Sequence, residues 1–417
     1  MAQDSDHPII VIGAGIVGVS AAIWLARAGR KVTLIDRGAP GMGTSYGNAG
    51  LLAACAMVPV TTPGLLPKAP HYLLSRNEPL FLRWSYLPRL APWLVKYLAH
   101  ANDPDTRRIA QGLTPITADT VEQHKALTAG TGAAHWITDS PYHFAYKTRA
   151  GYEADAYTNA LRREAGFVPD IIEGPAVQEV EPALGAQITC LATYADHAYI
   201  RDPGGYVAAL AEEFVRLGGD VRQAEVHDFT LSDGKVCEVI TSSGAMPCSG
   251  VVLATGVWSK PLMRKLGLKV PLESERGYHI VFEGAEGGPS APVMVASGKF
   301  VATPMAAGLR CAGVVEFGGL DAGPSRAPFA LLRRQVAATF PGLAAAREEE
   351  WQGHRPALTD SLPMIGEVGQ TGVFVGFGHH HIGLTGGPKT GRLIAQMMTG
   401  QGPNLDMSPY APGRFAR

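Results

Sequence analysis

Three glycines near the start of the chain have the spacing of a dinucleotide-binding turn. Gly13, Gly15 and Gly18 form the pattern G-x-G-x-x-G, and Asp36 follows at about the expected 20 residues. The first glycine allows a tight turn, the second lets the backbone approach a pyrophosphate, and the third lets a helix pack closely on a strand. Asp36 suits a ribose 2′-hydroxyl, and its charge disfavours a 2′-phosphate. These residues predict a site for a dinucleotide other than NADP.

The elements around these glycines are those that the motif requires. The apolar run from Ile9 to Ile12 predicts a buried strand, and Lys31 to Ile35 predicts a second one. Between them, residues 17 to 28 predict a helix that ends at Gly29. The N-terminus of that helix would present free N–H groups and a partial positive charge to phosphates. The context therefore indicates a nucleotide site rather than an ordinary glycine turn.

Distant segments favour FAD over NAD as the dinucleotide. In an NAD dehydrogenase, strands and helices would continue to alternate after the second strand, but residues 38 to 45 form a loop of small residues. A further strand ends in Thr255 and Gly256, and a glycine cluster at residues 376 to 387 precedes a helix whose first turn suits Pro388. A helix N-terminus aimed at a flavin would stabilise the negative charge of its reduced form. FAD is long and extended, so we expect these segments to converge on it.

Composition bounds the other classes of function. The 417 residues allow two or three domains, and 46% hydrophobic with 18% charged residues is typical of a folded chain with a large core. A net charge of −1 argues against nucleic-acid binding, which needs a basic surface. The five cysteines include no C-x-x-C pair, so a disulfide framework and a zinc site are not indicated, and a reducing compartment is the simpler interpretation.

Two further features concern location. No apolar stretch reaches the ~18 residues of a membrane span, and the first strand begins near Pro8, too early for a signal peptide to precede it. We therefore expect a cytoplasmic protein. Residues 57 to 98 are rich in proline and aromatic residues and predict broken helices and loops that form part of the substrate domain and its lid. The alternative is a peripheral contact with the inner face of a membrane or with a quinone, but the segment lacks a basic amphipathic face.

The remaining pattern predicts an α/β plus α+β fold. We expect a discontinuous Rossmann-type FAD-binding domain and an inserted substrate domain built on an antiparallel or mixed sheet. The FAD-binding domain would comprise residues 1–56, 145–268 and 346–417, and the substrate domain residues 57–144 and 269–345. Further helices are predicted at residues 104 to 130, 152 to 166, 204 to 217, 328 to 340 and 387 to 398. Further strands are predicted at residues 221 to 226, 236 to 241, 251 to 254, 278 to 282, 300 to 303, 309 to 314 and 373 to 376.

Consecutive histidines at positions 379 to 381 raise the question of a metal site. Neighbours in an extended segment point to opposite faces, so the three rings cannot all turn to one ion. We predict no metal and expect one of these histidines near the flavin edge. Cys55 and Cys311 are expected to be small buried residues rather than redox partners.

Taken together, these segments resemble the D-amino-acid oxidase and glycine oxidase superfamily of flavoenzymes, most closely the bacterial D-amino-acid dehydrogenases. The resemblance covers nearly the whole chain. The motifs that carry it are Val11 to Asp36, Thr44-Ser45-Tyr46-Gly47-Asn48-Ala49-Gly50, Ala254-Thr255-Gly256, Gly353-His354-Arg355-Pro356 with Asp360, Pro363 and Gly366, and Gly378-His379 through Gly383-Leu384-Thr385. The run Thr-Ser-x-x-Asn-Ala-Gly is more particular to the dehydrogenase branch than the glycine motif is.

The resemblance implies roles for particular residues. Arg355 matches the arginine that often grips the substrate carboxylate, and the alternative for it is an ion pair with Asp360 or a backbone carbonyl. Tyr278 matches an aromatic residue that often approaches the substrate, and His279 is its neighbour; the alternative for Tyr278 is ordinary packing in the core. His381 stands where glycine oxidases have a second arginine, which puts a two-point carboxylate clamp in doubt. The predicted catalytic residues are therefore Arg355, Tyr278, His279 and His381.

The resemblance also implies how the cofactor is held. Segment 44 to 51 usually runs along the pyrophosphate and flavin, and segment 381 to 387 usually lines the pyrimidine edge of the flavin. Residues 351 to 356 contain no cysteine to attach the flavin, so we predict non-covalent FAD. The predicted cofactor contacts are Gly13, Gly15, Ile16, Val17, Gly18, Asp36, Arg37, Thr44, Ser45, Asn48, Ala49, Gly50, Leu51, Val226, Thr255, Gly256, Gly383, Leu384 and Thr385.

The function that this resemblance implies is FAD-dependent oxidative deamination of D-amino acids to 2-oxo acids and ammonia, by hydride transfer from Cα to flavin N5. The first alternative is oxidation of a secondary amine or imino acid, such as D-proline, hydroxy-D-proline, sarcosine or an opine. An alternative of another class is a non-catalytic flavin-binding or tRNA-modifying protein, which would need a basic face that the net charge of −1 does not support. The electron acceptor could be a quinone, an electron-transfer protein or oxygen, and the sequence does not distinguish them.

Overall fold

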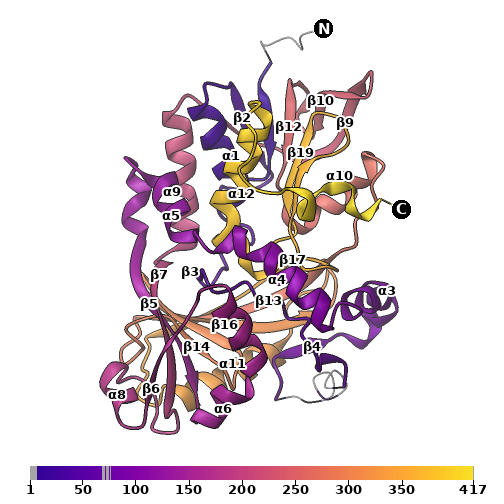
Figure 1. Ribbon diagram of the computed structural model, residues 1–417. Helices are drawn as coiled ribbons and strands as arrows, with labels where there is room; N and C mark the ends of the chain where they lie inside the picture. The colour runs from indigo at the N-terminus through magenta and orange to yellow at the C-terminus, as the bar shows by residue number, and fades with distance from the viewer. Residues whose placement is uncertain (1–6, 68–70, 72–74, 76, 417) are drawn as a thin grey trace.

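The computed structural model describes residues 7–67, 71, 75 and 77–416, and it is built around two large sheets (Figure 1). The upper sheet has the order β18-β19-β12-β1-β2-β8, parallel throughout except for the antiparallel edge strand β18. Its strands are β1 (Ile9–Ile12), β2 (Val32–Asp36), β8 (Asp220–Gln223), β12 (Gly250–Leu253), β18 (Met364–Glu367) and β19 (Val373–Phe377). Because β1 lies between β2 and β12, this is the Rossmann-type arrangement that the sequence predicts.

Both faces of the upper sheet are covered, because successive side chains of β1 point alternately into two different hydrophobic clusters. Ile9 and Val11 face the helix side, whereas Ile10 and Ile12 face a second cluster. The helix side carries α1 (Ile16–Arg27), α9 (Pro203–Arg216) and α12 (Gly383–Met398). The opposite face carries α10 (Ser259–Lys265) and the small sheet of β9 (Val226–Ser232), β10 (Lys235–Thr241) and β11 (Gly244–Pro247).

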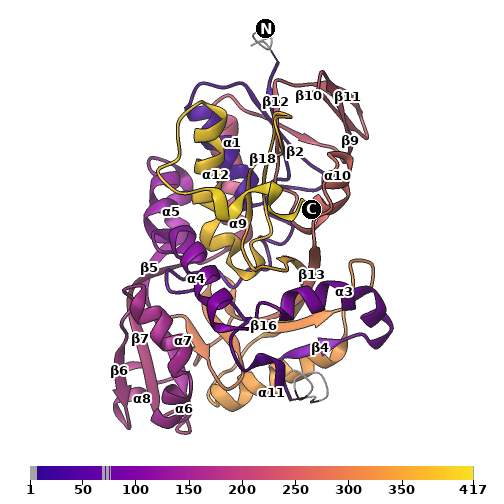
Figure 2. The same cartoon turned by 45° about the vertical axis from the view of Figure 1, so that its right-hand side comes forward.

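The lower sheet is larger and mixed, and it forms the floor beneath the upper domain in both views (Figures 1 and 2). Its path is β17-β13-β16-β15-β14-β5-β7-β3, with β4 added to β16 and β6 added to β7. The strands are β3 (Leu51–Leu52), β4 (Leu80–Leu82), β5 (Ile137–Tyr146), β6 (Asp170–Glu173), β7 (Cys190–Ile200), β13 (Leu272–Glu283), β14 (Val293–Val295), β15 (Phe300–Met305), β16 (Gly308–Phe317) and β17 (Arg347–Leu358).

The other helices lie around these two sheets. Helix α11 (Arg326–Thr339) packs beneath the lower sheet, on the face away from the upper domain. Other helices of the described chain are α3 (Leu87–Leu98), α4 (Asp103–Thr117), α5 (Thr120–Thr128), α6 (Arg149–Ala154), α7 (Ala156–Glu164) and α8 (Ala176–Val180). Short 3₁₀ helices are η1 (Trp84–Tyr86), η2 (Gly132–Trp136), η3 (Gly256–Trp258), η4 (His380–Ile382), η5 (Ser408–Tyr410) and η6 (Pro412–Phe415).

The structure corrects the single helix predicted at residues 104 to 130. The chain leaves helical geometry at Asp119, which separates α4 from α5. The Asp119 carboxylate is 2.8 Å from the Lys389 ammonium of α12. After the break, the Thr120 hydroxyl donates to the Thr385 carbonyl at 2.8 Å. Contacts with α12 therefore outweigh the helical periodicity that runs through the break. The helix predicted at residues 152 to 166 is likewise divided, into α6 and α7.

Sheet membership also corrects the predicted domain boundaries. Strands β5, β6 and β7 belong to the lower sheet, so residues 145–200 do not lie with the FAD-binding domain as predicted. Strand β17, within the predicted segment 346–417, also belongs to the lower sheet. Conversely, α4 and α5 bury their apolar side chains in the same core as α1 and α12. These boundaries depend on pairing between distant strands, such as β14 with β5, which a single sequence does not display.

Glycines allow α1 and α12 to pack closely side by side. A Cβ atom on Gly391 would lie 2.5 Å from the backbone nitrogen of Ala21, and one on Gly387 would lie 2.9 Å from the Ile16 side chain. Such distances leave no room for a methyl group. The contact places the N-termini of both helices at the same end of the upper domain, facing the lower sheet.

This packing gives a stability prediction. Gly391→Ala should lower the free energy of unfolding by ~1–3 kcal/mol, because overpacking against the Ala21 backbone outweighs the ~1 kcal/mol gain in helix propensity. Thermal unfolding monitored by circular dichroism measures the change. The control is Gly402→Ala, where an added Cβ would meet no atom within 4 Å. An equal melting temperature for Gly391→Ala and the wild type would contradict the proposed constraint.

Candidate active site

A cavity of about 1000 Å³ lies between the two sheets. Its walls come from the glycine turn after β1, the ends of β2, β12 and β19, the start of α12, and the upper face of the lower sheet. All the predicted cofactor residues line it except Gly18 and Gly50. The structure therefore brings together segments that are hundreds of residues apart, as the sequence predicts for one extended ligand.

The glycine turn has the geometry that the motif demands. Gly13 has a φ of +102°, and a Cβ there would meet the Ala254 carbonyl oxygen at 2.5 Å. A Cβ on Gly18 would lie 1.8 Å from the Gly13 carbonyl oxygen, so Gly18 acts through helix packing rather than through the cavity wall. The Ile16 N–H at the start of α1 donates to the Ser45 hydroxyl at 3.1 Å. This end of the cavity fits an anionic pyrophosphate.

The carboxylate of Asp36 is fixed at the end of β2. One oxygen accepts the Ala14 N–H at 2.7 Å, and the other accepts the Gly38 N–H at 2.9 Å. The side chain therefore braces the turn while it lines the cavity. The neighbouring Arg37 lies over the Trp258 ring, with 4.3 Å between the guanidinium carbon and the ring centroid. This corner has the acid and the planar surfaces that suit a ribose and a purine.

The loop from residue 43 to residue 50 is held from below by the lower sheet. The Arg310 guanidinium donates to the carbonyls of Tyr46 and Asn48, each at 2.7 Å, and the Thr44 hydroxyl donates to the His354 carbonyl at 2.8 Å. Arg310 is buried. Sequence reasoning missed this residue because it lies on a strand with no motif around it. An arginine between Leu309 and Cys311, inside an otherwise apolar predicted strand, was the available signal.

His279 supports the same loop and does not line the cavity. Its Nδ1 is 3.0 Å from the Gly47 carbonyl oxygen, and its ring stacks on Trp351 with a centroid distance of 5.0 Å. Burial, followed by the nearby Arg310, lowers the pKa of His279 to about 3, so the ring is neutral. The predicted catalytic role of His279 therefore has no support in this geometry, because the ring is separated from the cavity by the loop it holds.

Tyr278 points the opposite way from the predicted substrate side. Its ring packs edge-on against Phe329 of α11 with a centroid distance of 5.0 Å, in the core beneath the sheet. Its hydroxyl donates to Glu316 at 2.6 Å, and the same Glu316 carboxylate pairs with the buried Arg276 at 2.7 Å. Tyr278 contributes to the cavity wall, but its hydroxyl forms a hydrogen bond with the carboxylate of a buried ion pair. The geometry favours the core interpretation over contact with substrate.

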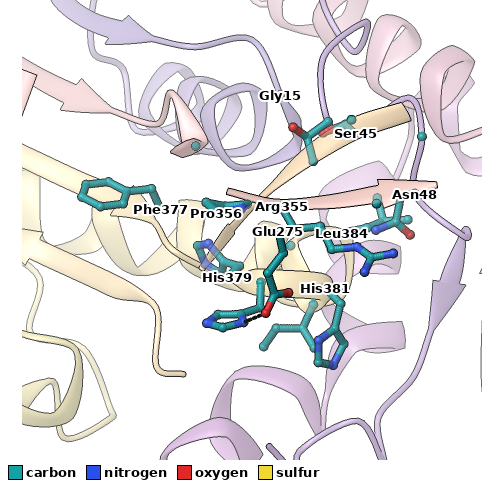
Figure 3. A pocket seen from close by; sticks show the side chains of 18 of the residues that line it. Gly15, Ser45, Asn48, Glu275, Arg355, Pro356, Phe377, His379, His381 and Leu384 are labelled. Atoms are coloured by element: carbon teal, nitrogen blue, oxygen red, sulfur yellow. Dashed lines mark ion pairs between the residues drawn. The ribbon is translucent and has the colours of Figure 1, made fainter. Parts of the chain in front are cut away.

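Arg355, by contrast, projects into the cavity from β17. Its guanidinium lies over Gly277 of the adjacent strand, where an added Cβ would come within 2.8 Å of the Arg355 Nε. It is not paired with Asp360, whose carboxylate binds Arg414 at 2.7 Å instead. Figure 3 shows Arg355 beside Glu275, with His381 on the same side of the strands. The structural alternative of an Arg355–Asp360 ion pair is therefore wrong.

The three consecutive histidines have three different environments. The Nε2 of His379 is 2.9 Å from the Thr390 hydroxyl, and burial lowers the His379 pKa to about 3. His380, at a φ of +49°, places Nε2 3.0 Å from the Leu358 carbonyl oxygen. His381 is exposed to the cavity, yet it lies deep in the molecule, and this enclosure together with His380 and Arg355 lowers its pKa to about 4. Among residues 7–67 and 77–416, no group of metal-ligating side chains converges.

The first turn of α12 is also braced. The buried His124 of α5 places Nε2 3.0 Å from the Leu384 carbonyl oxygen and Nδ1 2.8 Å from the Tyr206 hydroxyl. Burial lowers the pKa of His124 to about 4, so this connection stays neutral. Thr385 reaches the Leu51 carbonyl with its hydroxyl at 3.3 Å. The N-terminus of α12, with Gly383 and Leu384 in the cavity wall, is thus fixed where a flavin edge would lie. Sequence reasoning missed His124, which has no local motif.

Residues 57 to 98 form a side wall of the cavity. Their inward-facing apolar side chains include Val58, Leu65, Leu82, Leu90 and Leu94. Residues 68–70, 72–74 and 76 fall outside the described part of the chain. On the outer side, the exposed fractions of Trp84 and Val95 are 57% and 69%. The lid interpretation fits this placement. Within the described residues, no helix combines the length and the apolar character that crossing a membrane requires.

Comparison with known families agrees with this geometry. Residues 8–397 match the family described as FAD dependent oxidoreductase. The chain belongs to this family. Its cofactor is therefore FAD, and the residues present fit it: a glycine cradle that a Cβ would fill, and two helix N-termini facing one cavity.

Individual relatives agree over the full length. The chain is 36% identical to a D-amino-acid oxidase of Bradyrhizobium diazoefficiens over 98% of each protein, and 30% identical to a D-amino acid dehydrogenase of Paramagnetospirillum magneticum, again over 98% of each. Among solved structures it resembles a glycine oxidase from Bacillus cereus, with a TM-score of 0.72, 21% identity and 96% of each chain covered. It also resembles an L-proline dehydrogenase from P. horikoshii, with a TM-score of 0.74, 19% identity and 99% and 98% coverage. These two structures show the shared fold.

The site yields a prediction about the cofactor. Acid precipitation of the purified protein should release FAD into the supernatant, because no cysteine lies at residues 351 to 356 to bond it. Gly18→Val should abolish most FAD binding, because the added side chain collides with the Gly13 carbonyl. The flavin absorbance of the supernatant measures the release, and the ratio of flavin to protein absorbance of the purified variant measures its FAD binding. The control is Gly402→Val, away from the cavity, where a Cβ has no neighbour within 4 Å. Flavin that stays with the precipitate would contradict non-covalent binding.

Proposed function

We propose that this protein oxidises D-amino acids to 2-oxo acids and ammonia with FAD as the cofactor. The observation that carries the proposal is the Arg355 guanidinium, which faces the cavity over Gly277 and has no carboxylate within 4 Å among the described residues. An arginine in such a position can hold a carboxylate with two parallel hydrogen bonds. The names of the relatives, D-amino-acid oxidase and D-amino acid dehydrogenase, support an amino acid as the substrate.

The chain's own residues would bind and orient the substrate rather than react with it. Arg355 fixes the carboxylate, and the apolar wall of residues 57 to 98 excludes water from the Cα. Bound FAD supplies the hydride acceptor for the Cα hydrogen. The resulting imine is hydrolysed by water to the 2-oxo acid and ammonia. Gly277 has a positioning role, because any larger residue there would displace the guanidinium.

The stereochemistry and the electron acceptor belong to the proposal too. The D-configuration rests on the relatives' names, whereas a secondary amine such as D-proline or sarcosine would use the same carboxylate contact. We propose non-covalent FAD whose electrons pass to a quinone, an electron-transfer protein or oxygen.

Anaerobic reduction of the flavin tests the function. D-amino acids should bleach the flavin absorbance of the wild type, and Arg355→Ala should lower kcat/KM by ~10²–10³-fold, because a buried charged partner of the carboxylate is lost. Arg347→Ala is the matched control: it lies on the same strand, but its side chain is exposed and pairs with Glu283. The control should retain wild-type kcat/KM. A panel of D-, L- and N-methyl amino acids separates the substrate classes. If none bleaches the flavin, the proposed function and its secondary-amine alternative both fail.

The lid interpretation is tested by flotation with lipid vesicles. Several apolar side chains between residues 57 and 98, among them Leu82, Leu90 and Leu94, line the cavity wall and are therefore not available for insertion into lipid. We therefore expect the protein to stay out of the lipid fraction with vesicles of phosphatidylcholine and phosphatidylglycerol. Flotation that disappears in the double variant Trp84→Ser, Val95→Ser would instead assign this surface to peripheral membrane contact.

A further inference from the structure

Glu275 is a buried carboxylate in the wall of the cavity that no role above explains. It lies on β13, its exposed fraction is 7%, and its side chain faces the cavity (Figure 3). It stands directly opposite Arg355 in the antiparallel register of β13 and β17. Residues in such a pair have Cα atoms only ~4.5–5.5 Å apart. The cavity therefore presents a cation and an anion side by side.

The groups facing Glu275 come from three neighbouring elements. Arg355 projects from β17, His380 and His381 come from η4, and Tyr97 from α3. Burial raises the pKa of Glu275, but His380, Arg355 and His381 together outweigh burial, and the net pKa is lowered. The carboxyl group is therefore ionised at neutral pH. The pKa of Tyr97 is raised by burial and by Glu275, so Tyr97 is neutral.

His380 is the remaining titratable neighbour. Burial lowers its pKa, but Glu275 and the Leu358 carbonyl, with Asp360 further away, raise it overall. Asp360 is itself engaged by Arg414.

The carboxylate of Glu275 is under-satisfied by these neighbours. Within the described residues, the one cationic atom closer than 4 Å is Nδ1 of His380, at 3.7 Å from Oε1, which exceeds hydrogen-bond length. No backbone N–H or hydroxyl in the described chain donates to it within 3.5 Å. A buried charge without a donor is costly. By comparison, Glu273 on the same strand accepts from the Tyr86 hydroxyl at 3.0 Å and from the Ser274 N–H at 2.8 Å. A donor supplied by a ligand would satisfy Glu275.

We propose that Glu275 binds the ammonium group of the substrate. An α-amino acid carries a carboxylate and an ammonium on one carbon, and the Arg355–Glu275 pair presents complementary charges at neighbouring positions. The inference rests on the proposed function and deepens it, because it assigns substrate recognition to a zwitterion rather than to a carboxylate alone.

The substrate ammonium must lose one proton before hydride leaves Cα. One N–H bond breaks, its electron pair stays on nitrogen, and the proton passes to water, because a carboxylate whose pKa is lowered is a weak base. The substrate then carries the neutral amine whose lone pair the developing imine requires. His380, held by the Leu358 carbonyl, has a positioning role: it lies beside Oε1 and holds the carboxylate toward the cavity.

Glu275→Gln tests the proposal, with Glu273→Gln as the matched control on the same strand. In Glu275→Gln, kcat/KM for a D-amino acid should fall about 100-fold at neutral pH, the scale of losing a buried charged partner. The loss should shrink as the pH rises above the pKa of the substrate's ammonium, because the free amine then arrives already neutral. Glu275→Asp keeps the charge on a shorter side chain, so its kcat/KM should lie between those of the wild type and Glu275→Gln. FAD content checks that each variant folds.

A binding measurement without turnover gives an independent readout. Removing the negative charge beside Arg355 should tighten binding of a plain carboxylate such as propionate, measured by perturbation of the flavin spectrum or by calorimetry. A purely structural role predicts weaker binding of propionate and a loss of kcat/KM that is the same at every pH.

The possible failures are distinguishable. If the wild-type flavin is bleached by no amino acid, the proposed function fails. If the wild type is bleached and Glu275→Gln keeps its kcat/KM and pH profile, the inference fails alone. A Glu275→Gln variant that binds propionate more weakly than the wild type would also overturn it.

Discussion

The close contact between α1 and α12 is the constraint on which the site depends. At Gly391 and Gly387, α12 contributes no side chain to the contact, so its backbone lies directly against Ala21, Ser20 and the Ile16 side chain of α1. Both helices therefore begin at the same cavity, so that the partial positive charges of their N-termini are directed at one ligand. The braces at this end, Ser45 on α1 and His124 on α12, fix the first turns and not the middles of the helices. The packing of α1 against α12 therefore directs the dipoles of both helices towards the cavity.

The lower sheet contributes charge in a different way. On its upper face, Gly277 leaves the space that the Arg355 guanidinium occupies. Its lower face carries a buried ion pair, Arg276 with Glu316, under α11. Alternation along β13 thus sends neighbouring charged residues to opposite faces: Arg276 lies in the core under the sheet, and Glu275 faces the cavity. The same alternation explains why Tyr278 is drawn into the core.

The sequence predicts well what local pattern encodes. The βαβ unit around Gly13 follows from turn geometry and spacing, and Arg355 was found through a motif whose flanking residues shape a strand end. Residues whose role depends on a distant partner were not predictable in this way. Arg310 supports the loop at residues 43 to 50 and His124 supports the first turn of α12, and both are far away in sequence from what they support. His279 lies on the upper face of its strand, but it supports that same loop at residues 43 to 50 instead of lining the cavity. The break at Asp119 and the membership of β5 and β7 in the lower sheet also depend on tertiary contacts that override or extend local periodicity.

The upper sheet joins strands from the beginning, the middle and the end of the chain, which determines when the sheet can form during synthesis. Strand β1 comes from the first residues of the chain and β12 from the middle, yet β12 pairs on its other side with β19, near residue 375. The two helix N-termini that face the cofactor are likewise the first and the last long helices of the chain. A ribosome must therefore release almost the whole polypeptide before this sheet can close, and contacts of such sequence separation form slowly. We therefore expect FAD to bind late, after most of the chain has been synthesised and the upper sheet has formed.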